Sequence, residues 1–174
     1  MSNSGHLYLI CPECCLEETL RRHFRGRNFF LTMLGAVFDL ANYSFGDSIQ
    51  NLLDEQNIDE INVINDLNCS FFKNAIEPDD RINEFYAAKV IKEVESAYHV
   101  ANDPLLNAHQ KLKRMAEINV WEQMDRLKYV PQISDLMVKK NISVKGFTYD
   151  RHQDIFQEVI SGPAEIINLK ILTN

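Results

Sequence analysis

No apolar run in the 174 residues approaches the length of a membrane span, and no basic segment precedes the short apolar stretch near the N-terminus. We therefore expect neither a membrane-spanning segment nor a signal peptide, and we predict a cytosolic protein whose thiols stay reduced. Positive charge is also scarce, because 18 lysines and arginines stand against 25 aspartates and glutamates, for a net charge of −7. This deficit argues against a nucleic-acid partner, which needs clustered positive charge.

The sequence also lacks repeats, low-complexity tracts and a visible domain boundary, so we expect a single domain over residues 1–174. With 45% hydrophobic and 25% charged residues, the chain has the composition of an ordinary globular protein. One basic patch is present, "RRHFRGR" at residues 21–27. It could hold an anion, although the solvated end of a short helix is the favoured interpretation.

Cysteine is rare and unevenly spread, with three of the four residues at positions 11, 14 and 15 and the last at 69. This spacing suits no disulfide framework and leaves metal binding, redox chemistry or simple packing as explanations. The stretch "CPEC" is a C-x-x-C motif between an expected strand and an expected helix, which is the setting of a thioredoxin-like redox pair. Glu13 lies between the two thiols and would raise their pKa, which weakens the redox interpretation.

The first half of the sequence alternates short apolar runs with segments of helical periodicity. Strands are predicted at residues 7–11, 28–34 and 61–66, and helices at 16–24 and 48–56, with Ser48 as the N-cap of the second helix. Such alternation indicates βαβ units and a mostly parallel sheet with right-handed crossovers.

The second half is mainly helical. Helical spacing predicts two long helices over residues 80–102 and 105–127, separated by Pro104, and a short helix after Pro131. Two strands with a turn-length connection are predicted between residues 142 and 160. The fold class is therefore α/β, with a mainly parallel central sheet of about four strands, flanking helices and a C-terminal antiparallel strand.

Candidate metal ligands lie at the ends of two predicted strands. Cys11 ends the first strand, and Asp66 and Cys69 follow the third. Ligands of open parallel sheets bind beyond the carboxyl ends of the strands, so these side chains could share one metal ion. The alternative is that the two cysteines pack as small apolar groups in the core. None of the five histidines has ligand spacing to these residues.

The order of these motifs resembles the β-class carbonic anhydrase family. That family has Cys-Ser-Asp-Ser-Arg after its first strand, where this chain has "CPECC" at residues 11–15. "FFLTMLG" ends in Gly35 where the family has Arg-Asn-Ala-Gly, and "INVINDLNCS" at residues 61–70 stands where the family has Gly-His-x-x-Cys-Gly. "VKGFTYD" at residues 144–150 resembles Val-x-Gly-x-x-Tyr-Asp. The resemblance spans nearly the whole chain and implies the family fold, a zinc cofactor, a homodimer and a small-molecule or anionic ligand.

The resemblance also implies roles for individual residues. Cys11 and Cys69 fall on the zinc cysteines of the family, and Asp66 falls on its zinc histidine. Glu13 falls on the aspartate of the catalytic Asp-Arg dyad and is the remaining catalytic candidate, whereas Cys15 falls on the arginine. We therefore expect zinc ligands at Cys11, Asp66 and Cys69, with Cys15 as a possible fourth ligand.

These replacements predict a weakened enzyme. Carbonic anhydrase chemistry needs zinc to acidify a bound water, and two thiolates with a neutral imidazole cancel the charge of Zn²⁺. With Asp66 in place of the imidazole, the zinc site has a formal charge of about −1, and with Cys15, Cys14 or Glu13 as an additional ligand it has about −2. Each added negative charge weakens the acidification of the water bound to zinc. We predict a carbonic-anhydrase-like protein with impaired or absent CO2 hydration. The alternatives are an active zinc-dependent lyase or hydrolase on CO2-like substrates, a non-enzymatic binding protein with an empty site, and a C-x-x-C redox protein.

Overall fold

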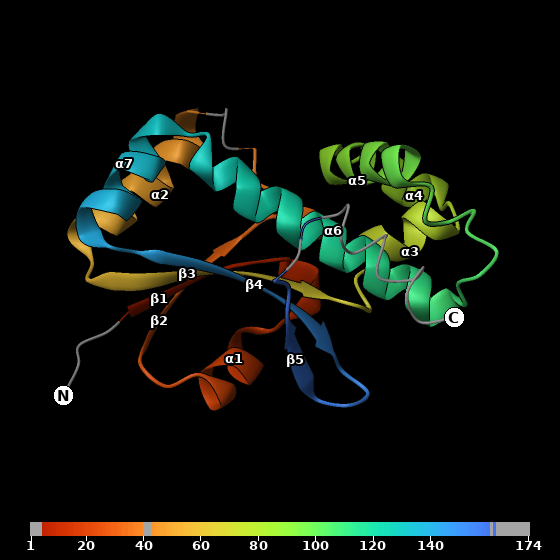
Figure 1. Ribbon diagram of the computed structural model, residues 1–174, viewed down its shortest axis with the longest axis horizontal. Helices are drawn as coiled ribbons and strands as arrows, with labels where there is room; N and C mark the ends of the chain where they lie inside the picture. Colours follow the sequence, from red (N-terminus) through yellow and green to blue (C-terminus); the bar gives the residue numbers. More distant parts are fainter. Residues whose placement is uncertain (1–4, 40–42, 161, 163–174) are drawn as a thin grey trace.

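The computed structural model describes residues 5–39, 43–160 and 162, and these residues form one five-stranded sheet in the order β2-β1-β3-β4-β5 (Figure 1). The strands are β1 (Gly5–Ile10), β2 (Arg27–Thr32), β3 (Ile58–Asp66), β4 (Ser143–Asp150) and β5 (Ile155–Glu158). β1 to β4 are parallel, whereas β5 runs antiparallel to β4. The predicted α/β fold, with four parallel strands and a C-terminal antiparallel strand, is confirmed.

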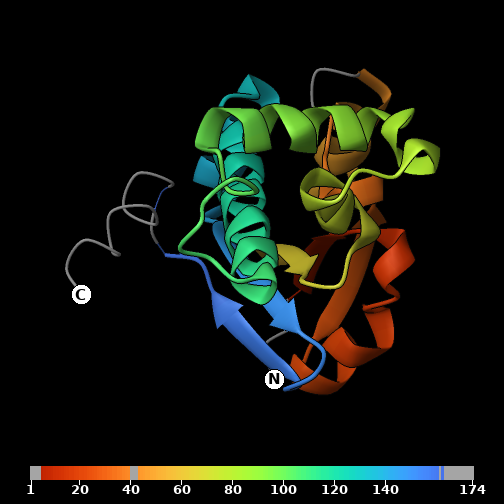
Figure 2. The same ribbon diagram turned by 90° about the vertical axis from the view of Figure 1, so that its right-hand side faces the viewer.

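Helices cover the two faces of the sheet unequally. The helices are α1 (Glu17–His23), α2 (Tyr43–Glu55), α3 (Ser70–Ile76), α4 (Asp80–Asn83), α5 (Tyr86–Tyr98), α6 (Ala108–Lys128) and α7 (Pro131–Lys140), with 3₁₀ turns η1 (Pro12–Cys14) and η2 (Leu34–Ala36). α2, α6 and α7 lie on one face and α1 on the other, while α3, α4 and α5 gather beside α6 (Figures 1 and 2). In the part of the chain that is described, no helix combines the length and apolar character needed to cross a membrane.

Two helix predictions need correction. The helix expected over residues 80–102 is divided, because Phe85 is extended between α4 and α5 and its ring packs edge-on against Phe71, with 6.1 Å between centroids. Ser48 is not an N-cap, since α2 begins five residues earlier and includes Gly46. Glycine is a poor helix former, and packing of the helix against the core offsets its low propensity. α3 was not predicted at all.

Close packing of α6 on the sheet depends on Gly146 of β4. A Cβ atom at this position would lie 2.3 Å from Cγ1 of Val120 and 2.6 Å from Sδ of Met124, both on α6. We expect Gly146→Ala to lower the free energy of unfolding by about 1–3 kcal/mol, because α6 must shift to admit the methyl group. Urea denaturation measures the change, with Ser143→Ala at the exposed start of β4 as the control. Equal midpoints for the two variants would contradict this packing.

Candidate metal centre

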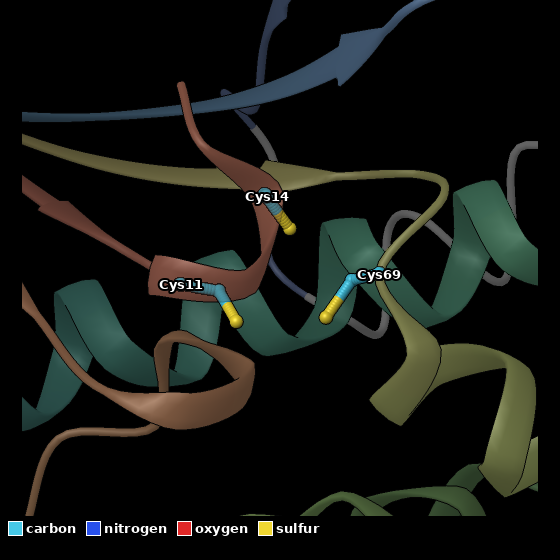
Figure 3. Close-up of side chains that lie close together, drawn as sticks. All are labelled: Cys11, Cys14 and Cys69. Carbon is cyan, nitrogen blue, oxygen red and sulfur yellow. The ribbon is translucent and has the colours of Figure 1, made fainter. Parts of the chain in front are cut away.

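Three cysteines form a buried cluster at the carboxyl end of the sheet. The Sγ atoms of Cys11, Cys14 and Cys69 all lie within 4.8 Å of one another, and none of the three residues is more than 4% exposed. Figure 3 shows their side chains converging from three segments: the end of β1, the turn η1 and the residue before α3. Within residues 5–39, 43–160 and 162, no other group of three such ligands comes together. We call these three residues the thiol cluster.

A single 3₁₀ turn brings Cys11 and Cys14 together. The N–H of Cys14 donates to the carbonyl oxygen of Cys11 at 3.1 Å, and Pro12 occupies the first position of the turn, where its fixed φ is favourable. A 3₁₀ helix has three residues per turn, so the side chains of residues i and i+3 lie on the same side. The C-x-x-C spacing therefore places two sulfur atoms next to each other.

Cys69 reaches the same place from β3. The carboxylate of Asp66 accepts a hydrogen bond from the N–H of Asn68 at 2.7 Å, and the carbonyl oxygen of Asp66 accepts one from the N–H of Cys69 at 3.1 Å. These bonds form a tight turn at the end of β3, of the kind that aspartate favours. Because β1 and β3 are neighbouring parallel strands, this turn brings Cys69 to the end of β1, where Cys11 lies.

The turn η2 closes the cluster from a third side. The N–H of Gly35 donates to Sγ of Cys11 at 3.2 Å. Gly35 has φ +63, and a Cβ atom there would lie 2.8 Å from Cδ1 of Ile91, so both the backbone conformation and the space require glycine. The carbonyl oxygen of Gly35 accepts a hydrogen bond from the buried side chain of Asn119 on α6 at 3.2 Å. The backbone donor to the Cys11 sulfur is thus held in place by the main helix.

The three thiols share their protons unequally. Hydrogen bonds from Cys14 and Cys69, together with the Gly35 N–H, lower the pKa of Cys11. The same contact with Cys11 raises the pKa of Cys14 and of Cys69, and burial raises both further. These opposite shifts make Cys11 the first of the three thiols to lose its proton. A metal ion that bound all three sulfur atoms would displace two protons.

The cluster fits a thiophilic divalent metal such as zinc. Zinc–sulfur bonds are about 2.3 Å long, so two sulfur ligands of a tetrahedral zinc ion are about 3.8 Å apart. The three Sγ atoms, each within 4.8 Å of the others, need only small movements to reach this spacing. Thiolates are also the ligand type that zinc and softer metals prefer.

The structure does not bring Asp66 into the cluster. Its carboxylate accepts hydrogen bonds from the N–H of Asn68 and from Nε of Arg151 in the β4–β5 turn. Alternation along the strand explains this placement, because the preceding Asn65 donates to the carbonyl oxygen of Ala116 on α6 and the next side chain points to the opposite face. Burial raises the pKa of Asp66, while Asn68 and Arg151 oppose that shift.

Cys15 and Glu13 also lie outside the cluster. Cys15 has a left-handed backbone conformation with φ 49 at the end of η1, and its exposed Sγ lies 3.5 Å from the carbonyl oxygen of Pro12. The carboxylate of Glu13 accepts a hydrogen bond from the hydroxyl of Ser70 at 2.6 Å, in an exposed position. Neither side chain joins the buried sulfur atoms.

Of the ligands expected from the sequence, the structure thus brings together Cys11 and Cys69. The third member is Cys14, which the sequence analysis gave only as one of three possible additional ligands. The C-x-x-C spacing between Cys11 and Cys14 is the sequence feature that indicates this ligand. Arg151 was not singled out from the sequence at all. It donates both to the carboxylate of Asp66 and to the carbonyl oxygen of Cys14.

Comparison with known proteins agrees with this architecture. The carbonic anhydrase family model matches residues 15–155, a stretch that begins just after Cys14 and includes Asp66, Cys69 and Arg151. No curated protein matches the chain significantly.

Solved β-carbonic anhydrases share the fold at low sequence identity. The enzyme CafA of the fungal pathogen Aspergillus fumigatus is 19% identical, with a TM-score of 0.78 over 97% of this chain and 82% of that one. One of two tetrameric enzymes of Sordaria macrospora is 17% identical, with a TM-score of 0.78 over 92% and 83%. The Coccomyxa enzyme in complex with acetazolamide is 19% identical, with a TM-score of 0.74 over 94% and 76%. From the family match and the shared fold together, this chain belongs to the β-carbonic anhydrase family.

Proposed function

We propose that this protein is a β-carbonic-anhydrase-like protein that holds zinc through Cys11, Cys14 and Cys69 and has impaired or absent CO2 hydration activity. The observation that carries the proposal is the approach of three buried sulfur atoms to within 4.8 Å of one another. A bound zinc ion supplies Lewis-acid chemistry, and its strength depends on the charge of the ligands.

The charge of the thiol cluster supports weak hydration. Three thiolates around Zn²⁺ leave a formal charge of about −1, whereas two thiolates and an imidazole, the set that the resemblance implies for the family, leave about zero. Added negative charge weakens the polarisation of a bound ligand. Asp66 does not add further charge at the metal, since Arg151 pairs with it.

The arrangement around Glu13 supports the same conclusion. The resemblance implies a carboxylate paired with an arginine next to the metal, and Glu13 is the carboxylate at that position. Its hydrogen-bond donor is the hydroxyl of Ser70, and the arginine position is occupied by the exposed Cys15. Arg151 is engaged with Asp66. Among the described residues, Glu13 forms no ion pair with a cationic partner that would fix its orientation and keep it an acceptor.

Self-association as a homodimer is part of this proposal. The Sordaria macrospora relative is tetrameric, which supports assembly of this chain as well. The redox alternative has less support. The sulfur atoms of Cys11 and Cys14 lie side by side, but both residues are almost completely buried. Thiols that take part in thiol–disulfide exchange need access to solvent.

Zinc content and CO2 hydration, measured on the same preparation, test the proposal. Protein purified without chelators is expected to contain about one zinc ion per chain, as three thiolates and one further ligand complete a tetrahedral site. Stopped-flow assays between pH 7 and 9 are expected to show CO2 hydration close to the uncatalysed rate. Efficient turnover at neutral pH would contradict the charge argument and favour an active lyase. Absence of zinc would contradict the metal site.

A further inference from the structure

We propose that Arg151 is a positioning residue that keeps the metal site purely thiolate, because it withholds the carboxylate of Asp66 from the metal and fixes the turn that carries Cys14. This inference rests on the proposed zinc site. It adds a residue from the β4–β5 turn, which neither the sequence motifs nor the thiol cluster itself includes.

Arg151 connects the two segments that frame the cluster. Its Nε donates to Oδ2 of Asp66, and its Nη2 donates to the carbonyl oxygen of Cys14. Asp66 ends β3 three residues before Cys69, and Cys14 ends η1. One guanidinium group therefore contacts both ligand-bearing segments, which the planar fork of arginine can do and a lysine ammonium cannot do with the same geometry.

Asp66 needs a cationic partner. The side chain of Asp66 is completely buried, whereas that of Arg151 remains 41% exposed. A buried carboxylate is stable as an anion only when it is paired or coordinates a metal. A zinc ion held by Cys69, three residues along the chain, is another cation that the carboxylate could approach by a change at the end of β3. Because Arg151 pairs with the carboxylate, Asp66 is held away from Cys11 and Cys69, and Cys14 supplies the third ligand.

The contact with Cys14 acts in the same direction. The carbonyl oxygen of Cys14 is the group that Arg151 holds, so the backbone at Cys14 is tied to the same guanidinium that occupies Asp66. Loss of Arg151 would therefore free the carboxylate of Asp66 and would also remove the donor that holds the backbone of Cys14. Arg151 thus favours a site whose protein ligands are the three thiolates over a site in which the carboxylate replaces Cys14, with the fourth position left to a further ligand in both. Thiophilic ions prefer the first, whereas oxygen ligands suit harder ions.

Cobalt(II) substitution of the full-length protein tests this inference, because thiolate-to-cobalt charge-transfer absorbance reports the number of sulfur ligands. Arg151→Ala is expected to replace the Cys14 ligand by the Asp66 carboxylate and to remove about one third of that absorbance, one sulfur out of three. Its zinc affinity should fall about 10- to 100-fold, as for other residues that orient ligands. Arg81→Ala is the matched control, since it removes an ion pair between Arg81 of α4 and Asp79, the N-cap residue of that helix, and neither residue belongs to the thiol cluster.

Two further variants separate competition by Asp66 from simple loosening. Arg151→Ala combined with Asp66→Asn removes the competing carboxylate, and the absorbance of three thiolates is expected to return. Asp66→Asn alone is expected to keep that absorbance and remains informative if Arg151→Ala does not fold. An unchanged spectrum in Arg151→Ala or a changed spectrum in Asp66→Asn alone would overturn the role of Arg151. No recovery in the double variant would overturn the withholding of Asp66 and would leave only the hold on the Cys14 turn. Failure of the unmodified protein to bind cobalt or zinc would instead overturn the proposed function.

Discussion

Replacing Cys14 by serine is expected to remove zinc from the purified protein, whereas replacing the adjacent Cys15 is expected to leave zinc in place. Cys14 is buried with its sulfur beside those of Cys11 and Cys69, and Cys15 is exposed at the end of the turn. Loss of one of three thiolate ligands should weaken zinc binding by more than the roughly 10- to 100-fold cost of removing a residue that only orients a ligand. Metal analysis after dialysis against a weak chelator measures the difference.

The two variants are closely matched, since each exchanges one sulfur for one oxygen at neighbouring positions of the same turn. Circular dichroism and a thermal melt should show that both remain folded, so that zinc loss reflects coordination. Cys69→Ser is a second positive control and should behave like Cys14→Ser. Loss of zinc in Cys15→Ser with retention in Cys14→Ser would show that the metal selects the other thiol and that η1 rearranges on binding.

The sheet could be predicted from the sequence because its information is local. Short apolar runs separated by helical segments predict parallel strands, and the two strands near the C-terminus are separated by a turn-length connection. The division between α4 and α5 could not be predicted in this way. It depends on Phe85, whose extended backbone places its ring against Phe71 of α3, a helix that had itself not been predicted.

The candidate site depends even more on contacts between residues that are far apart in the sequence. The sequence predicted that Cys11 and Cys69 lie close together, because each follows one of two parallel strands, and β1 and β3 are neighbours in the sheet. The direction in which Asp66 points depends on the pleat of β3, and a shift of one residue reverses it. Arg151 is separated from Asp66 by 85 positions in the sequence, and no motif links them. Only the turn between β4 and β5, placed by the whole sheet, brings the guanidinium group to the carboxylate.

The position of the family arginine falls on Cys15, whereas the buried cluster contains its neighbour Cys14. The backbone explains the difference, since the 3₁₀ turn aligns residues three apart and the left-handed residue after it turns outward. Local geometry within "CPECC" therefore decides which thiols can bind metal together.

Zinc affinity is expected to rise by about 100-fold for each pH unit between pH 6 and 8. We expect Cys14 and Cys69 to keep their protons in this range, because contact with Cys11 and burial raise the pKa of each, and we expect Cys11 to be the thiolate, because its pKa is lowered. Zinc binds the deprotonated forms, so binding releases two protons, and each released proton contributes about a factor of ten per pH unit. The sign follows directly, since a higher pH removes the competing protons and favours the metal-bound state.

The slope of affinity against pH therefore counts the thiols that become ligands. Competition with a chromophoric chelator, corrected for the protonation of the chelator, measures it. The unmodified protein and Cys15→Ser should both show a slope near two protons. A site built from Cys11, Cys69 and the ionised Asp66 would release only the proton of Cys69 and would show a slope near one. A slope near one in the unmodified protein would thus contradict binding by all three sulfur atoms, and a slope near two is the result expected when Cys14 is the third ligand.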